Sequence, residues 1–229
     1  MILVSGATGF VGSAVVRELL RRGERVAVLG RDAGKVREKF GSAVEPREGD
    51  VREPQTLLAA MQDVETVVNA VQFPNSPIEN RRKGWTFEEI DLKGTRNQVD
   101  VAKASGVRRF VYVSGVGADK DADRHWFRYK WEAESYLRGS GLEWVIVRPT
   151  WVYGPGDVSL NRFLGFAKML PFVPMFGNGE QAMQPVFVDD VGRVLADAAT
   201  RPEAANQLFE LGGPDVLSMN EVVRTALEV

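Results

Sequence analysis

The chain has 229 residues, of which 44% are hydrophobic and 26% are charged. This composition can bury the core of one globular domain and excludes a disordered or fibrous chain. The 29 basic and 31 acidic residues leave a formal net charge of −2, so we expect no nucleic-acid partner. The chain has no cysteine and one histidine. Disulfides, thiolate metal sites and cysteine nucleophiles are therefore excluded, and we expect no metal site.

Short apolar runs alternate with amphipathic stretches along the sequence. In chain order, strands are expected at 2–5, 25–29, 44–49, 66–71, 109–114, 144–148, 185–188 and 207–211. Helices are expected at 10–22, 32–40, 53–61, from a loop at 73–83 to about 105, and at 123–138, 160–170, 190–200 and from 218. This alternation predicts an α/β class with a doubly wound parallel sheet, the Rossmann fold.

The composition changes after Pro149, where residues 150–185 become rich in glycine, proline, phenylalanine and methionine. We expect one domain over 1–229, in which 150–185 and 205–229 form a small, discontinuous substrate-side region. The last predicted helix reaches Val229 without a stop signal, so we expect either that the parent protein continues or that its ordered part ends there.

The two most apolar segments do not predict targeting or membrane insertion. The run from Met1 to Val4 has no basic residues before it and is cut short by Ser5, unlike a signal peptide. The stretch 160–176 contains two charged residues and two prolines, too short and broken for a transmembrane helix. We expect a cytoplasmic protein without a transmembrane segment.

A glycine-rich loop joins the first predicted strand to the first predicted helix. Gly6 permits a tight turn, Gly9 lets the backbone approach a pyrophosphate, and Gly12 lets the helix pack against the strand. The helix N-terminus adds free N–H groups and partial positive charge. With Thr8, Phe10 and Val11 between the glycines, the loop predicts a dinucleotide site, although the same spacing also occurs in simple turns.

The end of the second strand indicates which dinucleotide binds. An NAD site places an acid there to bind the ribose 2′-hydroxyl, but Gly30 fills that position and Arg31 follows it, with Lys35 one helical turn later. Because a guanidinium can bind a 2′-phosphate, we expect NADP(H) to be favoured over NAD(H). The alternative is that Arg31 is a solvated charge and Asp32 a helix cap.

These motifs resemble the short-chain dehydrogenase/reductases of the extended and atypical kind, which are similar to NAD-dependent epimerases and dehydratases. Within that family, the sequence resembles the group that contains the NADPH-binding accessory subunit of respiratory complex I. The resemblance covers nearly the whole chain and implies that the cofactor is contacted by Asp50, Val51, Asn69, Ala70, Val71, Lys130, Pro149 and Val152, besides the glycine loop, Arg31 and Lys35.

The sequence departs from the family pattern at its acid–base pair. The family carries a tyrosine four residues before a lysine, so that both face the nicotinamide. Lys130 fits the lysine position, but Trp126 stands in place of the tyrosine and cannot exchange a proton. Tyr129 is next to Lys130, about 100° around the helix, and is expected to point elsewhere.

The resemblance also implies that Ser114 is catalytic, together with Lys130. Ser114 could instead simply end a strand, and Lys130 could bind the ribose without catalysis. Asp91 lies where relatives carry an assisting asparagine, and His125 is a substitute acid or a helix-surface residue. We expect Trp126 to pack over the nicotinamide region or to fill the substrate entrance.

Two further segments are candidates for a substrate pocket: 73–85, with the basic run Arg81-Arg82-Lys83, and 160–176. Their apolar residues could receive a hydrophobic small molecule or a protein partner, or form an ordinary core. Three functions follow. The first is an NADP(H)-binding protein with a degenerate site and weak or no dehydrogenase turnover. The second is an active NADPH-dependent oxidoreductase or sugar-nucleotide epimerase/dehydratase with a substitute acid. The third is a complex-assembly binding module.

Overall fold

The structure is a computed structural model that describes residues 1–74, 78–158 and 178–228. The helix predicted near 160–170 and the candidate pocket segment 160–176 lie outside the described residues, and most of the region 150–185 does too.

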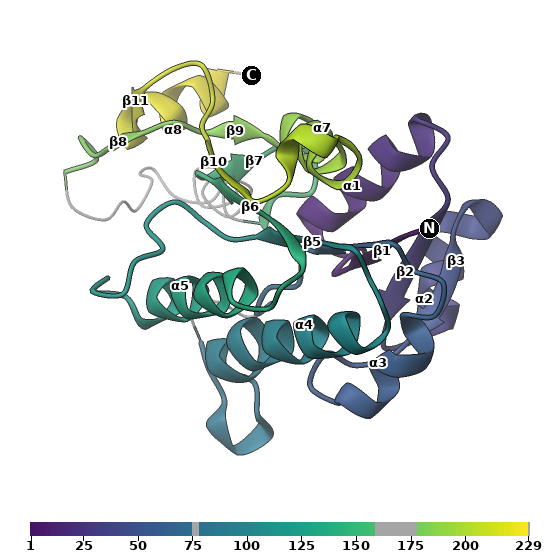
Figure 1. The fold of residues 1–229 in the computed structure, drawn as a ribbon. Coiled ribbons are helices and arrows are strands. Elements are labelled where there is room, and N and C mark those ends of the chain that lie inside the picture. The colour runs from purple at the N-terminus through teal and green to yellow at the C-terminus, as the bar shows by residue number, and fades with distance from the viewer. Residues whose placement is uncertain (75–77, 159–177, 229) are drawn as a thin grey trace.

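A seven-stranded sheet forms the centre of the molecule (Figure 1). Its strands run in the spatial order β10-β6-β5-β4-β1-β2-β3, and every neighbouring pair is parallel. Their bounds are β1 (Ile2–Ser5), β2 (Val26–Gly30), β3 (Glu45–Glu48), β4 (Thr66–Asn69), β5 (Arg109–Val113), β6 (Glu143–Pro149) and β10 (Gln207–Leu211). The strand order reverses between β1 and β4, which is where open α/β sheets bind their ligands.

Helices cover both faces of the sheet. The core on one face contains side chains of α1 (Phe10–Arg21), α2 (Ala33–Phe40) and α7 (Val188–Thr200). The core on the other face contains side chains of α3 (Pro54–Ala60), α4 (Gly94–Ala104) and α5 (His125–Arg138). The buried strands read as continuous apolar runs because both faces are covered. The predicted doubly wound Rossmann architecture is confirmed.

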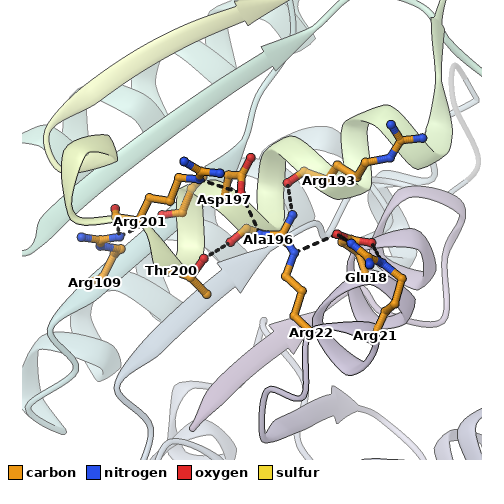
Figure 2. Close-up of polar contacts among 10 residues, drawn as sticks. Glu18, Arg21, Arg22, Arg109, Arg193, Ala196, Asp197, Thr200 and Arg201 are labelled. Carbon is orange, nitrogen blue, oxygen red and sulfur yellow. Dashed lines mark hydrogen bonds and ion pairs between the residues drawn. The ribbon is translucent and has the colours of Figure 1, made fainter.

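Helices α1 and α7 pack together although they are far apart in sequence (Figure 1). A Cβ atom at Gly192 of α7 would lie 3.0 Å from the backbone of Ala14, so a larger residue would require the two helices to move apart by a few tenths of an ångström. Figure 2 shows Arg22 joining the two helices: its Nε donates to Glu18 at 2.7 Å and its Nη1 donates to Asp197 at 2.7 Å. The helix that follows the glycine loop is therefore tied to the C-terminal part of the chain.

Two small sheets lie outside the central one. Strand β7 (Val152–Tyr153) pairs in parallel with β9 (Val186–Phe187), and β8 (Ala182–Met183) pairs in antiparallel fashion with β11 (Leu217–Ser218). Whether they belong to a substrate-side region stays a prediction.

Several predicted boundaries were wrong by a few residues. The strand predicted at 185–188 is only Val186–Phe187, because α7 begins at Val188, two residues before the predicted start. The last helix, α8 (Met219–Glu228), begins after Ser218, whose hydroxyl accepts the Glu221 N–H while Glu221 accepts the Ser218 N–H, a capping box. The helix predicted to reach about 105 contains a π-helical stretch, η3 (Glu88–Lys93), before α4.

Short 3₁₀ helices complete the described structure: η1 (Gly41–Ala43), η2 (Arg81–Lys83) and η4 (Pro202–Ala204). Within the described ranges, no helix combines the length and the apolar character needed to cross a membrane. The cytoplasmic location stays a prediction.

Candidate functional site

The glycine loop has the shape that a dinucleotide needs. Gly6 has φ +71°, and a Cβ atom there would lie 2.4 Å from the Ala70 carbonyl oxygen. A Cβ atom at Gly12 would lie 2.3 Å from the Gly6 carbonyl oxygen, so neither position accepts a side chain. Gly9 differs, because a Cβ atom there would meet only the Gly6 oxygen, at 3.1 Å. Gly9 caps α1 without any side-chain hydrogen bond, which leaves the helix N-terminus to a phosphate.

The loop is also fastened from α2. Lys39 Nζ donates to the Thr8 carbonyl oxygen at 2.8 Å. Burial and the nearby charge of Arg17 lower the pKa of Lys39. Sequence reasoning missed Lys39, since only the fold brings it back to the loop.

The end of β2 has no room for an acid at the position where NAD sites carry one. A Cβ atom at Gly30 would lie 2.8 Å from the Val36 Cγ2 atom, and Val36 is fully buried. Asp32 is the N-cap of α2 and accepts the N–H groups of Gly34 and Lys35, so its predicted capping role is present. Arg31 is exposed and lies with its Cζ atom 5.4 Å from the centre of the Trp85 ring.

The segment after β3, which is predicted to contact the cofactor, carries an arginine that sequence reasoning missed. Both carboxylate oxygens of Asp50 accept hydrogen bonds from Arg52, the shortest at 2.7 Å. Burial alone would raise the pKa of Asp50. The hydrogen bonds from Arg52 outweigh this effect, so that the net shift of the pKa is downward. The Val51 carbonyl oxygen accepts from Asn97 of α4 at 2.9 Å. Asp50 and Val51 are thus held in place by neighbouring side chains, and their contact with the cofactor stays a prediction.

Asn69, at the end of β4, is fully buried, and its side-chain amide forms hydrogen bonds with other protein groups. Its Oδ1 accepts from Ser5 Oγ at 3.1 Å and from the Val71 N–H at 3.0 Å, while its Nδ2 donates to Thr95 at 3.0 Å. The side chain therefore joins β1, β4 and α4. The backbone of Ala70 lies against Gly6, so the two cofactor-side loops meet at the switch point of the sheet.

The Ser114 hydroxyl is hydrogen-bonded to another side chain. Its Oγ donates to Glu134 Oε1 at 2.6 Å. Glu134 is fully buried and also accepts from Arg148 at 2.7 and 2.8 Å and from Arg138 at 3.1 Å. Sequence reasoning missed Glu134, although its spacing of four residues from Lys130 places both on one face of α5.

Lys130 and Asp91 form a buried pair. Lys130 Nζ lies 3.7 Å from Asp91 Oδ1, and the two side chains are 8% and 1% exposed. Asp91 Oδ2 accepts the Phe73 N–H at 2.8 Å. Burial raises the pKa of Asp91 from 3.8 to about 6, against the opposing effect of the Lys130 charge. Burial likewise raises the pKa of Tyr112, whose ring lies 5.8 Å from Lys130 Nζ.

Trp126 packs in an aromatic cluster rather than standing alone. Its ring stacks on Phe87 at 5.5 Å between centroids, and the Arg124 guanidinium lies 5.5 Å from it. His125 contacts the rings of Phe87, Trp126 and Tyr129, and its Nε2 lies 3.3 Å from Glu79 Oε2. The position that resembles the family's tyrosine is thus filled by an indole that contacts both Phe87 and Arg124.

The segment after β6 reaches back toward the glycine loop. Pro149 ends β6 and its carbonyl oxygen accepts the Val116 N–H at 3.1 Å. Val152 lies in β7 and packs against the core below α1 and α7. A Cβ atom at Gly156 would lie 3.9 Å from the Phe10 ring.

No group of three His, Asp or Glu side chains that could hold a metal ion occurs among the residues described.

These residues fit a dinucleotide along the carboxyl ends of β1, β2 and β4. The fold brings together the glycine loop, Arg31, the segment at Asp50, and Ala70. Ser114, Lys130 and Asp91 lie together on the α5 side, each bonded to or paired with another buried group or backbone N–H.

Comparison with known proteins agrees with this geometry. The chain matches the NAD(P)H-binding family over residues 6–168 and the NAD dependent epimerase/dehydratase family over residues 127–212. It is 31% identical over 227 residues to NAD(P)H azoreductase of Xenophilus azovorans, which covers 97% of this chain and 71% of the relative.

A second relative is NADH dehydrogenase (ubiquinone) 1 alpha subcomplex subunit 9, mitochondrial, of Arabidopsis thaliana. The two are 30% identical over 228 residues, which is 96% of this chain and 55% of the subunit, so this chain spans about half of that relative.

Among solved structures, MoeE5 in complex with UDP-glucose and NAD superposes with a TM-score of 0.81 at 25% identity, covering 99% of this chain and 81% of that one. From its glycine loop, its parallel sheet and these matches, the chain belongs to the NAD(P)H-binding family and is an atypical short-chain dehydrogenase/reductase.

Proposed function

We propose that this protein binds NADP(H) in preference to NAD(H) and has weak or no dehydrogenase turnover. The observation that carries the proposal is Trp126, whose ring contacts Phe87 and Arg124 at the position that resembles the family's proton-transferring tyrosine. When bound, the cofactor would supply or accept a hydride. The chain must supply the proton, and an indole cannot.

The remaining catalytic candidates support the same conclusion. The Ser114 hydroxyl is bonded to Glu134 at 2.6 Å, and the Lys130 ammonium lies beside Asp91. Each group already has a protein partner, which it would have to share or release in order to act on a substrate. The relative named as an NADH dehydrogenase subunit supports a role in which the nucleotide is held within an assembly.

The choice of NADP(H) is supported at the end of β2. Gly30 leaves no space for an acid, since Val36 already fills it, and Arg31 follows with an exposed guanidinium. A 2′-phosphate would gain a charge-assisted hydrogen bond there that a 2′-hydroxyl would not.

The test measures binding and turnover on the same preparation. We expect NADPH at 100 times its Kd to stabilise the fold by about 2.7 kcal/mol, or about 5–10 °C in Tm for a chain of this size, with a smaller shift for NADH at the same concentration. Arg31→Ala should remove this difference. Single-turnover decay of NADPH absorbance with excess diketone or quinone should be slow, and fast decay would contradict the proposal.

A second candidate function is an active NAD(P)H-dependent oxidoreductase with Asp91 as substitute acid. The raised pKa of Asp91, about 6, and its place beside Lys130 favour it, as does the relative named as an azoreductase. In that case the wild-type protein would oxidise NADPH rapidly, and Asp91→Asn would abolish this activity. If His125 were the acid instead, His125→Ala would abolish it.

A further inference from the structure

Three side chains from three separate segments meet at the carboxyl ends of β2 and β3. The Cζ atom of Arg31 lies 5.4 Å from the centre of the Trp85 ring, and that of Arg52 lies 5.9 Å from it. Both distances are within the range of a cation–π contact, about 6 Å. One indole therefore contacts two guanidinium groups that follow neighbouring strands.

Trp85 is anchored by its own loop. Its backbone pairs with that of Asn80 through two hydrogen bonds, of 2.7 and 3.0 Å. Between them, Gly84 takes the left-handed conformation at φ +63°. The Trp85 side chain also packs against the buried cluster of Phe73, Phe87 and Ile90. The loop thus fixes the indole over the strand ends, while its basic tip stays exposed.

The charges of Arg31, Arg52 and Asp50 do not cancel. Arg52 is neutralised by Asp50, which it holds through Nε and Nη2. Arg31 forms no ion pair with any residue that the structure describes, and it only adds a longer-range effect on the Asp50 pKa. The two arginines and Asp50 sum to a charge of +1, and the further acids that act on this group, Glu53 and Glu89, act on Arg52.

A cation–π contact with Trp85 also leaves the N–H groups of a guanidinium available for hydrogen bonds. The contact with the indole uses the positive charge of the group, whereas hydrogen bonds to phosphate are made by its N–H groups. A guanidinium already held against a ring loses less conformational freedom when it binds an anion. The indole therefore prepares Arg31 for a phosphate group in particular.

We propose that Trp85 is a positioning residue for cofactor choice, which holds Arg31, beside the Asp50-paired Arg52, so that Arg31 receives the 2′-phosphate of NADP(H). This inference rests on the proposed NADP(H) binding and adds a residue outside the glycine loop and β2. The cofactor preference would then depend on the loop before α4 as well as on Arg31.

The test compares two replacements of Trp85 that separate packing from stacking. Trp85→Leu keeps apolar contact with Phe73 and Phe87 but removes the aromatic face, whereas Trp85→Phe keeps a face. Calorimetry would give the Kd of NADPH and of NADH for each variant, with circular dichroism and thermal melts to verify the fold. The control is Tyr136→Ala, which removes an exposed ring whose centre lies 5.3 Å from the Cζ atom of another arginine, Arg96.

We expect Trp85→Leu to weaken NADPH binding by about three- to thirty-fold and to change NADH binding by less than about two-fold. Trp85→Phe and Tyr136→Ala should stay close to wild type. In an Arg31→Ala background, Trp85→Leu should have a much smaller effect on NADPH, because the group that it positions is gone.

Each other outcome has a distinct meaning. Equal weakening of NADPH and NADH by Trp85→Leu would overturn the inference and place the indole against the part that both cofactors share. An NADPH preference that survives Trp85→Leu but is lost in Arg31→Ala would overturn the role of Trp85 alone. Equal Kd values for NADPH and NADH in wild type would overturn the inference together with the proposed function.

Discussion

Replacing Asp91 by asparagine tests whether a buried carboxyl group beside Lys130 makes the stability of this protein depend on pH. Asp91 is 1% exposed, and burial raises its pKa from 3.8 to about 6. Asparagine has nearly the same shape and can still accept the Phe73 N–H, but it does not titrate. The variant therefore removes one proton-binding group from the fold.

The magnitude follows from the pKa shift. Between pH 4 and 6 the folded protein keeps a proton on Asp91 that the unfolded chain has released, so stability falls as the pH rises through this window. A shift of about 2 pKa units corresponds to about 3 kcal/mol, which is fully lost above pH 6–7. The stability of Asp91→Asn relative to wild type should therefore increase by about 3 kcal/mol between pH 4 and pH 7.

The assay is urea unfolding followed by tryptophan fluorescence at several pH values from 4 to 7.5. Any change in packing or hydrogen bonding that does not depend on pH shifts the whole asparagine curve, so the slope with pH rather than the offset carries the test. Asp215→Asn, at an exposed aspartate, is the control and should follow wild type. Parallel curves for Asp91→Asn and wild type would refute the raised pKa of Asp91 and remove the support for Asp91 as an acid.

Three further predictions concern the site. Gly9→Val should fold but lose dinucleotide binding in calorimetry, since its side chain would occupy the space next to the helix N-terminus. Gly12→Val should not fold, because its Cβ atom would lie 2.3 Å from the Gly6 carbonyl oxygen. Wild-type affinity in folded Gly9→Val would refute the loop assignment. Trp126→Tyr should speed single-turnover reduction of diketones or quinones by NADPH at least tenfold, because general acid–base help is worth about 10²–10⁴-fold; an unchanged rate would show that the missing tyrosine is not what limits turnover. Ser114→Ala should lower the unfolding free energy by about 1–3 kcal/mol through the lost hydrogen bond to a buried carboxylate, and no change in urea unfolding would contradict that role.

The fold was predictable from the sequence where local signals were strong. The apolar runs of β1, β5 and β6 and the periodicity of α1 gave the parallel sheet, and the three glycines located the loop. Boundaries near residue 185 were less accurate, because β9 has only two residues before α7 begins. Such a short strand is set by its pairing with β7 rather than by its own composition.

The candidate site was predictable only in part, because its important contacts cross long distances in the sequence. Lys130 and Asp91 were both singled out, but their pairing depends on how α5 packs against the helix that precedes α4. The contact of Trp85 with Arg31 spans more than fifty residues, and no spacing rule indicates it. Glu134 is the exception, since the four-residue spacing from Lys130 was available in the sequence.

The close packing of α1 on α7 has a consequence for how the protein is made. The helix that starts at the glycine loop is covered by a helix that leaves the ribosome some 180 residues later, with Gly192 against Ala14 and Arg22 bonded to Asp197. At a synthesis rate of about 5–20 residues per second, the apolar face of α1 stays exposed for about 10–40 seconds. A chaperone that binds nascent chains would therefore find its target on the nucleotide-binding end of the molecule until the last third of the chain has emerged.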